Sequence, residues 1–532
     1  MSKTLTYAKQ EIFAELDKRL EDGIIEKTNA DLIKKLVKNA ETLDEAIQIS
    51  ELGTTYKKTG FHFDKRLDKT STTIKYFKKN DNLSFEDKDC DALTHKLIIG
   101  DNYNCLLNLL VQYREKIDVV YIDPPYSKNK MGEFARTNYR NSLTRDNLLS
   151  MLYPRLVLAK QLLSKEGFLF CSIDDKNYAY VKCLLDEILG EKHYINSFVW
   201  KKNSSEKTEK TKFTINTEYV LFYSNSSAYV LNDVYKPLSQ ATIDTYKYDD
   251  NDGRGKYATI SLNKTKSPGP QTTYDYIDNN GRVWKCPPKG WRMIQSKVKD
   301  LENDNRLVFD GKRPRVKDYW NERKDEGKRV DTLWNDLPEN TTGSSQLDNI
   351  VGEGLFDNPK PVELIKRCIG ISDKNATVLD FFAGSGTTGQ AVLDLNRDDG
   401  GERHFILCTL NETTDKTPNG IAYDVTSKRL KRIMQGECYD GSTDFNWNKS
   451  NDCFGDSLDV YEIAEVSSFE SVAGQTPFDV IDETLYGVEK FSTLKEKVEW
   501  VCNHFEITQK EIENDSEWQE RVEEKKDAAR GN

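Results

Sequence analysis

Residues 117–126, IDVVYIDPPY, join an apolar run to an acid, two prolines and a tyrosine. The run 119–122 consists of β-branched and aromatic residues, which predicts a short buried strand. The prolines end this strand, because they cannot donate a ladder hydrogen bond and they fix φ. Asp123 and Tyr126 are therefore expected in a stiff geometry. A strand-ending turn without further function is the alternative, because Asp and Pro are common turn residues.

Strands and helices alternate on both sides of this stretch, which predicts a parallel, doubly wound α/β sheet. The helix 144–167 is interrupted by Pro154 and is expected to close at Gly167. The predicted strands are 97–99, 117–122 and 168–174, followed later by strands that begin near 378 and 403, and a further helix is expected at 176–190.

Composition excludes several classes of protein. The 532 residues are 31% charged, and no apolar run approaches the 18 residues that a membrane span needs. The first 20 residues resemble an amphipathic helix and lack the apolar core of a secretion signal. Ten cysteines lie far apart without a CxxC pair, and five histidines are scattered. We therefore expect a reduced, cytoplasmic protein that binds no metal and no membrane.

The net charge of −11 conceals a basic stretch from Arg254 to Lys299, which has ten Lys or Arg and only two acids, Asp275 and Asp278. Tyrosines and tryptophans are interleaved with these cations. Cations neutralise phosphates and rings stack on bases, so the stretch predicts a nucleic-acid face. The alternative is a solvated surface over a few core aromatics. The candidate DNA contacts are Arg254, Lys256, Lys264, Lys266, Arg282, Lys285, Lys289 and Arg292.

A second motif lies at 378–392, VLDFFAGSGTTGQAV, which indicates a strand, a glycine-rich turn and a helix. Gly384, Gly386 and Gly389 form a GxGxxG pattern, in which small residues allow a ligand to approach the backbone and the helix offers free N–H groups. Glu412 ends the following strand, where an acid can hold ribose hydroxyls. A nicotinamide or flavin oxidoreductase fits this motif alone, but it does not predict the acid and prolines at 123–125.

One family accounts for both motifs. Phe382, Gly384 and Gly386 match the Phe-x-Gly-x-Gly motif of S-adenosylmethionine-dependent amino-methyltransferases, and residues 123–126 match the catalytic motif of the same enzymes. The catalytic motif precedes the cofactor motif, an order that resembles the β class of DNA methyltransferases. Four further segments resemble the modification (Mod) subunits of type III restriction–modification systems: 51–67, 95–110, 153–175 and 478–491.

The resemblance implies that S-adenosyl-L-methionine is the cofactor and that the methyl acceptor is the N6 amine of a flipped-out adenine. Asp123 and the Pro124 carbonyl would accept the two amine hydrogens, Pro125 would stiffen the loop, and Tyr126 would stack on the base. Cytosine-N4 is the less favoured acceptor, because enzymes of that type usually begin the motif with Ser. The implied cofactor-binding residues are Asp101, Lys360, Pro361, Asp380, Phe382, Ala383, Gly384, Gly386, Thr387 and Glu412.

The same resemblance implies a domain order and partners. Double-stranded DNA is the expected substrate, the chain is expected to form a homodimer, and a separate restriction (Res) subunit would supply ATP-driven cleavage, because the chain contains no GxxxxGK phosphate loop. A solitary methyltransferase and a non-catalytic DNA-binding protein with this fold remain alternatives. The expected parts are a helical and mixed extension (1–90), a catalytic half (91–200), an inserted target-recognition domain (201–350), a cofactor-binding half (351–435) and a partly helical C-terminal region (436–532).

Overall fold

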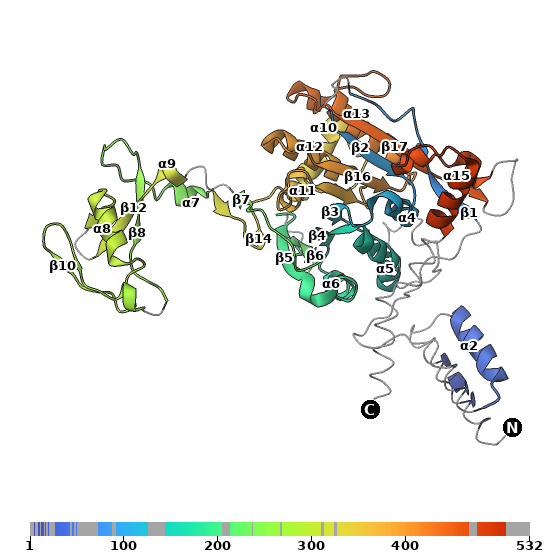
Figure 1. Ribbon diagram of the computed structural model, residues 1–532, viewed down its shortest axis with the longest axis horizontal. Helices are drawn as coiled ribbons and strands as arrows, with labels where there is room; N and C mark the ends of the chain where they lie inside the picture. The colour runs from blue at the N-terminus through green and yellow to red at the C-terminus, as the bar shows by residue number, and fades with distance from the viewer. Residues whose placement is uncertain are drawn as a thin grey trace. The chain divides into compact units, whose positions relative to one another are not determined.

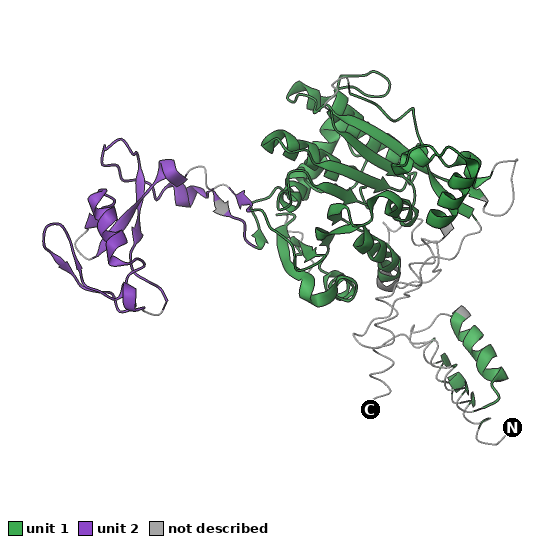
Figure 2. Ribbon diagram, in the orientation of Figure 1, with its two compact units in different colours: residues 1–232, 332–532 green, residues 233–331 purple. Residues whose placement is uncertain are grey.

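The computed structural model forms two compact units, residues 1–232 with 332–532 and residues 233–331 (Figure 2). The residues that it describes are 73–87, 92–125, 144–204, 213–236, 238–266, 269–309, 313–323, 327–467 and 476–506, together with 27–42 and shorter pieces of the first 50 residues.

The first unit is built on a ten-stranded sheet with the order β1-β17-β2-β16-β15-β3-β4-β6-β5-β14 (Figure 1). The six strands from β17 to β4 are parallel, whereas β1 and β6 run antiparallel to their neighbours. The strands are β1 (Thr73–Lys79), β2 (Thr94–Ile99), β3 (Ile117–Ile122), β4 (Leu163–Ile173), β5 (Tyr194–Lys201), β6 (Thr217–Ser224), β14 (Leu333–Trp334), β15 (Thr377–Asp380), β16 (His404–Thr409) and β17 (Ser457–Ser467).

Both faces of the sheet are buried, which confirms the predicted doubly wound class. Along β3, Val120 packs in a core cluster with residues of the helices α4 and α5, and its neighbours Val119 and Tyr121 are equally buried although they point to the other face. The helices of this unit are α2 (Lys27–Asn39), α4 (Asn102–Tyr113), α5 (Thr144–Leu162), α6 (Tyr178–Leu185), α10 (Asn340–Val351), α11 (Val362–Ile369), α12 (Thr387–Asp399), α13 (Lys428–Gln435), α14 (Pro477–Val480) and α15 (Leu494–Val501).

The predicted end of one helix is wrong, and the two compact units have other bounds than the expected parts of the chain. The helix expected to close at Gly167 ends at Leu162, because Leu163 already pairs with Ile117 in the ladder of β3 and β4. The expected insert 201–350 is broader than the second unit, because β6 pairs in the main sheet and α10 belongs to the first unit. The terminal regions also enter the sheet, since β1 from 1–90 pairs with β17 from 436–532.

The second unit has its own small core and a three-stranded sheet with the order β11-β12-β8. Its core contains Tyr276, Trp284 and Trp291, which are at most 4% exposed. Its elements are β7 (Tyr235–Lys236), α7 (Gln240–Ile243), β8 (Tyr257–Ser261), β9 (Tyr276–Ile277), β10 (Val283–Trp284), α8 (Gln295–Asn303), β11 (Leu307–Phe309), β12 (Pro314–Tyr319), α9 (Trp320–Arg323) and β13 (Lys328–Arg329).

Helix α10 approaches the backbone of 359–361 so closely that a Cβ on Gly343 would lie 2.3 Å from the Pro359 carbonyl oxygen, so only glycine fits there.

Among the described residues, no helix combines the length and the apolar character needed to cross a bilayer.

Candidate active site

The candidate site lies where four parallel strands of the first unit end. Strands β2, β16, β15 and β3 are consecutive in the sheet, so their carboxyl ends share one edge, which is where ligands bind in open α/β sheets. Backbone hydrogen bonds join the loops that follow: Gly100 N donates to Thr409 O at 2.9 Å, and Ala383 N donates to Cys408 O at 3.1 Å. These bonds hold the loop after β2 and the loop after β15 to the end of β16, although the three segments are distant in sequence.

Asp123 is the first residue after β3, and the strand beside β3 is β15, with Val120 opposite Leu379. The two sequence motifs therefore follow adjacent strands. The Asp123 side chain is 27% exposed, and Pro124 is buried. Tyr126, the fourth residue of the predicted catalytic motif, lies outside the described residues.

Asp123, the catalytic candidate, belongs to a network of four charged residues, which also contains Lys360, Glu218 and Lys202. Lys360 Nζ donates to Asp123 Oδ2 at 2.8 Å and lies 3.3 Å from Glu218 Oε2. Lys202 Nζ donates to Glu218 Oε1 at 3.1 Å. Lys360 and Glu218 have side chains that are only 6% exposed, so negative and positive charges alternate through a largely dry region.

Glu218 is held in its charged form by this network. Burial acts to raise the pKa of its carboxyl, but the neighbouring charges of Lys360 and Lys202 and their hydrogen bonds outweigh burial, so the pKa is lowered. A charged Glu218 in turn stabilises the ammonium of Lys360 next to Asp123. The predicted cofactor contact of Lys360 stays a prediction, whereas its contact with Asp123 is observed.

The glycine-rich turn, residues 383–387, connects β15 to α12. Gly384 and Gly386 have φ values of 49° and 78°, in the left-handed region that favours glycine. A Cβ would lie 3.1 Å from Phe356 at Gly384 and 3.2 Å from Thr426 at Gly386. The turn therefore requires both glycines and keeps its backbone bare of side chains.

Asp380 is hydrogen-bonded to residues on both sides of this turn. Its carboxylate accepts a hydrogen bond from Phe382 N at 2.9 Å and one from Thr388 Oγ1 at 2.5 Å, so it joins the two ends of the turn. Burial raises the pKa of Asp380 to about 7, and the nearby charge of Asp123 acts in the same direction. Asp380 is thus a structural group of the turn, and its predicted role toward the cofactor stays a prediction.

Asp101 follows β2 and begins α4 as its N-cap, accepting a hydrogen bond from Tyr103 N at 3.0 Å. Its other oxygen pairs with Arg155 at 2.9 Å. The adjacent Asn102 donates to Phe381 O at 2.8 Å and accepts from Arg155, which links this loop to the segment after β15. Asp101 thus lies at the same edge of the sheet as the glycine-rich turn.

The remaining predicted cofactor residues lie close to the ends of the same strands. Glu412 comes three residues after β16, and its backbone carbonyl accepts from Ile421 N at 2.9 Å. Pro361 caps α11 immediately after Lys360. Contacts of Pro361, Phe382, Ala383, Thr387 and Glu412 with a cofactor stay predictions.

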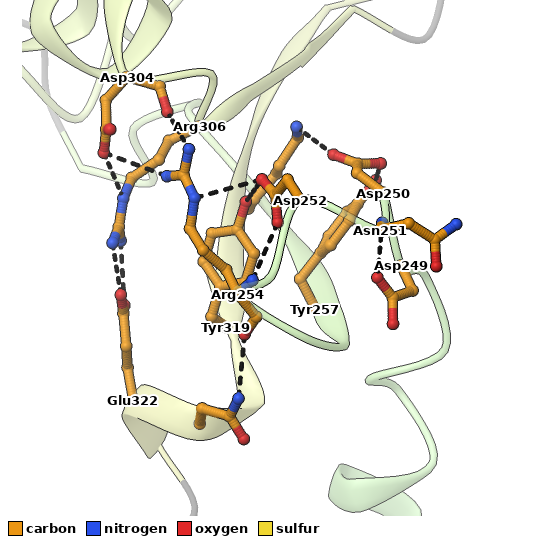
Figure 3. A network of polar contacts seen from close by, with 12 residues as sticks. Asp249, Asp250, Asn251, Asp252, Arg254, Tyr257, Asp304, Arg306, Tyr319 and Glu322 are labelled. Atoms are coloured by element: carbon orange, nitrogen blue, oxygen red, sulfur yellow. Dashed lines mark hydrogen bonds and ion pairs between the residues drawn. The ribbon is translucent and has the colours of Figure 1, made fainter.

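In the second unit, the predicted DNA-binding residue Arg254 is engaged within the protein (Figure 3). Its guanidinium pairs with Asp252 at 3.2 Å and with Asp304 at 3.3 Å, and it lies over the ring of Tyr319. Arg306 pairs with the same Asp304 at 2.8 Å. Arg254 therefore helps to hold the loop 249–252 to the small sheet.

Four of the predicted DNA contacts come from two paired segments, 262–266 and 289–292. Lys264 N donates to Gly290 O at 3.0 Å and Arg292 N donates to Leu262 O at 2.7 Å. The side chains of Lys289 and Arg292 donate to the carbonyls of Thr265 and Asn263 at 3.2 Å and 3.1 Å. Lys264 and Lys266 lie on the first of these segments, so the four cations come from two neighbouring segments of the unit.

The other predicted DNA contacts are dispersed. Lys285 pairs with Asp275 at 2.7 Å, Arg282 lies over Trp284, and Lys256 is exposed just before β8. The prediction that the interleaved aromatics stack on bases is wrong for Tyr257 and Trp284, which are 6% and 4% exposed and fill the unit's interior.

Sequence reasoning missed Glu218, Lys202 and Arg155. Glu218 follows Thr217 at the start of β6, and its only signal was an acid within a buried strand. Lys202 and Arg155 carry no motif. Their roles depend on contacts with Glu218 and with Asp101, which are distant in sequence.

A parallel sheet with a proline-fixed acid after one strand and a glycine-rich turn after its neighbour defines a nucleotide-cofactor enzyme of the doubly wound class. The DNA methylase family matches residues 117–417, and the chain belongs to this family. A second family, described as an uncharacterised conserved protein, matches residues 10–119.

Curated relatives agree with this family. The chain is 32% identical over 434 residues to the StyLTI Mod subunit of a type III restriction–modification enzyme of Salmonella typhimurium, with 74% of this chain and 64% of that subunit covered. It is 30% identical over 411 residues to the type II methyltransferase M.KpnI of Klebsiella pneumoniae, with 68% and 91% covered. The chain thus spans about 64% of the length of the first relative and nearly all of the second.

The PvuII DNA methyltransferase, described as cytosine-N4-specific, is 12% identical, and the likeness covers 69% of this chain and 96% of that one with a TM-score of 0.38.

The charge network predicts a large effect of Glu218→Gln on stability. The change leaves Lys202 and Lys360 facing a neutral amide in a buried site, so the free energy of unfolding should fall by about 3 kcal/mol. Thermal unfolding at neutral pH measures the loss. Glu339→Gln is the matched control, because Glu339 pairs at 3.4 Å with Lys201 but its side chain is 29% exposed, compared with 6% for Glu218. Equal melting temperatures of the two variants would contradict the role given to Glu218.

Asp380 predicts a pH-dependent difference in stability. Between the unfolded-state pKa of about 4 and the folded-state pKa of about 7, the folded protein holds a proton that the unfolded chain releases, so stability falls as pH rises. Asp380→Asn removes this dependence and keeps an oxygen that can accept from Phe382 N. The melting temperature of the variant minus that of the wild type should therefore rise between pH 5 and pH 7 and then level off. A constant difference would show that Asp380 is charged throughout.

Proposed function

We propose that this chain transfers the methyl group of S-adenosyl-L-methionine to the N6 amine of adenine in DNA, as the modification subunit of a type III restriction–modification system. The observation that carries the proposal is the placement of Asp123 and the glycine-rich turn after adjacent strands, β3 and β15. An acceptor held by Asp123 and a cofactor held by the turn would meet at one edge of the sheet. Membership of the DNA methylase family supports this assignment.

The residues at this edge fit the proposed cofactor. The glycine-rich turn presents bare backbone, because side chains at Gly384 and Gly386 would meet Phe356 and Thr426. We assign the amino-acid part of the cofactor to this turn, and the nucleoside part to Asp101 and Glu412, whose carboxylates suit amine and hydroxyl groups. When bound, S-adenosylmethionine supplies a methyl group on a positively charged sulfur, which is electrophilic.

The chain's part of the reaction is to hold the amine. The lone pair of the adenine amine is delocalised into the ring, so the amine is a poor nucleophile. Asp123 accepts one amine hydrogen and the Pro124 carbonyl accepts the other, which draws the nitrogen toward sp³ geometry and exposes its lone pair. Lys360 holds Asp123 Oδ2 at 2.8 Å and so fixes the orientation of the carboxylate. The base must leave the duplex first, because its amine is otherwise paired.

We assign target recognition to the second unit, residues 233–331. The cations of the two paired segments would bind phosphates, because they bring several positive charges into one part of the unit: Lys264, Lys266, Lys289 and Arg292. Arg254 is the least suited of the predicted contacts, because its guanidinium already pairs with Asp252 and Asp304.

The partners follow from the type III relatives. Three relatives are Mod subunits of type III restriction–modification enzymes, which supports a Res subunit as the partner of this chain. We further propose that the chain forms a homodimer and acts in the cytoplasm, where both its DNA and its cofactor are found.

A solitary methyltransferase without a nuclease partner is the second candidate. It is favoured by the type II relative from Klebsiella pneumoniae, which this chain matches over 91% of that protein's length. Cytosine-N4 as the acceptor is less favoured, because the catalytic motif begins with Asp123 rather than Ser.

Single-molecule sequencing of DNA from a methylation-free host that expresses the chain tests these proposals, with Asp123→Ala as the control. We expect N6-methyladenine in one short motif, on one strand only, and none with the variant, because the alanine cannot accept the amine hydrogen. Methylation of both strands of a palindrome would favour the solitary enzyme. N4-methylcytosine, or the same adenine methylation from a folded Asp123→Ala variant, would contradict the proposal.

A further inference from the structure

Arg429, near the start of α13, is a fully buried cation that contacts the glycine-rich turn. Only 1% of the residue is exposed. Its guanidinium donates to Thr387 Oγ1 at 2.8 Å, to the backbone carbonyl and the hydroxyl of Ser385 at 3.3 Å each, and to Gln390 Oε1 at 2.8 Å and 3.1 Å. One side chain thus binds both the turn and the first part of α12.

These acceptors are all uncharged. Within the described residues no carboxylate forms an ion pair with Arg429, and burial lowers its pKa to about 9 even though the charge of Asp394 opposes the change. A buried cation usually has an ionic partner, because transfer from water into the interior is costly. Packing alone therefore does not explain why a guanidinium that donates only to uncharged acceptors is buried at this position.

The local backbone directs two side chains to the same turn. Residues Ala422–Ser427 form a π-helical segment directly before α13, and such segments are frequent at functional sites. From its end, Thr426 Oγ1 donates to Gly384 O at 2.5 Å, and Arg429 follows three residues later. The turn is therefore held from one side by side-chain donors, which engage its carbonyl and hydroxyl groups.

We propose that Arg429 is a positioning residue that sets the affinity of the site for S-adenosylmethionine. It fixes the backbone of the glycine-rich turn, and its positive charge behind the turn favours the carboxylate of the cofactor's amino-acid part. The inference rests on the proposed function, because it assigns the ligand of that turn. It concerns cofactor affinity and not the methyl-transfer step, which belongs to Asp123.

Arg403 supplies a matched control. It is also 1% exposed, and it binds the opposite end of α12, where its guanidinium pairs with both oxygens of Asp399 at 3.0 Å and 2.9 Å. The two arginines thus share burial and contact with one helix, but only Arg429 contacts the turn.

The experiment compares Arg429→Lys, Arg429→Met and Arg403→Lys with the wild type. For each purified protein we would measure the melting temperature, the Kd of S-adenosylhomocysteine by calorimetry, and KM and kcat for methyl transfer to DNA. For Arg429→Met we expect the Kd and the KM for S-adenosylmethionine to rise about ten-fold or more, with kcat within about three-fold of the wild type. For Arg429→Lys we expect a Kd and a KM between those of the wild type and those of Arg429→Met, because lysine keeps the positive charge but not the several N–H donors of the guanidinium.

Arg403→Lys should lower the melting temperature but leave the Kd within about two-fold of the wild type, because its contacts are remote from the turn. The proposal is overturned if Arg429→Met, folded by its melting transition, binds S-adenosylhomocysteine as the wild type does. It is equally overturned if Arg403→Lys weakens binding as much. Failure of the wild type itself to bind S-adenosylhomocysteine would instead refute the proposed function.

Discussion

The ion pair between Lys360 and Asp123 is the interaction on which the arrangement of the site depends. A buried ammonium requires counter-charges, and Lys360 finds two of them, Asp123 after β3 and Glu218 in β6. Glu218 precedes the second unit in the sequence and Lys360 follows it, so this pair joins the two flanks of the insertion within the first unit. Gly343 permits the approach, since a side chain there would collide with the backbone at 359–361. The orientation of the Asp123 carboxylate is thus set by Lys360 and Glu218, which are both distant from Asp123 in sequence.

The sequence was sufficient to predict what local patterns determine. The parallel sheet follows from alternating apolar strands and helices, and the glycine-rich turn follows from positions that require a left-handed backbone, such as Gly386. The charge network could not be predicted, because Glu218 has no local signature and acquires its role only when β6 pairs with β4 and brings it to Lys360. The contribution of β17 to the sheet was missed for the same reason, since strand order is decided by long-range pairing.

The basic stretch shows how composition can mislead about individual residues. The interleaved rings of Tyr276, Trp284 and Trp291 form the core of a small unit, because a domain of this size must bury its few large side chains. Arg254 forms an ion pair with Asp252, in an acidic loop of the same unit. Lys264 and Arg292 stay predicted phosphate contacts. The Arg292 guanidinium donates to the carbonyl of Asn263, which leaves its positive charge uncompensated.

The observed contact of Lys360 is its hydrogen bond to Asp123, whereas the cofactor contact that the family resemblance implies stays a prediction. The direct measurement is kcat of Lys360→Met for methyl transfer to DNA at saturating S-adenosylmethionine, together with the Kd of S-adenosylhomocysteine. If Lys360 orients Asp123, we expect kcat to fall about 100-fold, because a misplaced catalytic group costs about that much, while the Kd stays within about two-fold of the wild type. A weakened Kd with an unchanged kcat would make Lys360 a cofactor ligand and would contradict a role of Lys360 in orienting Asp123.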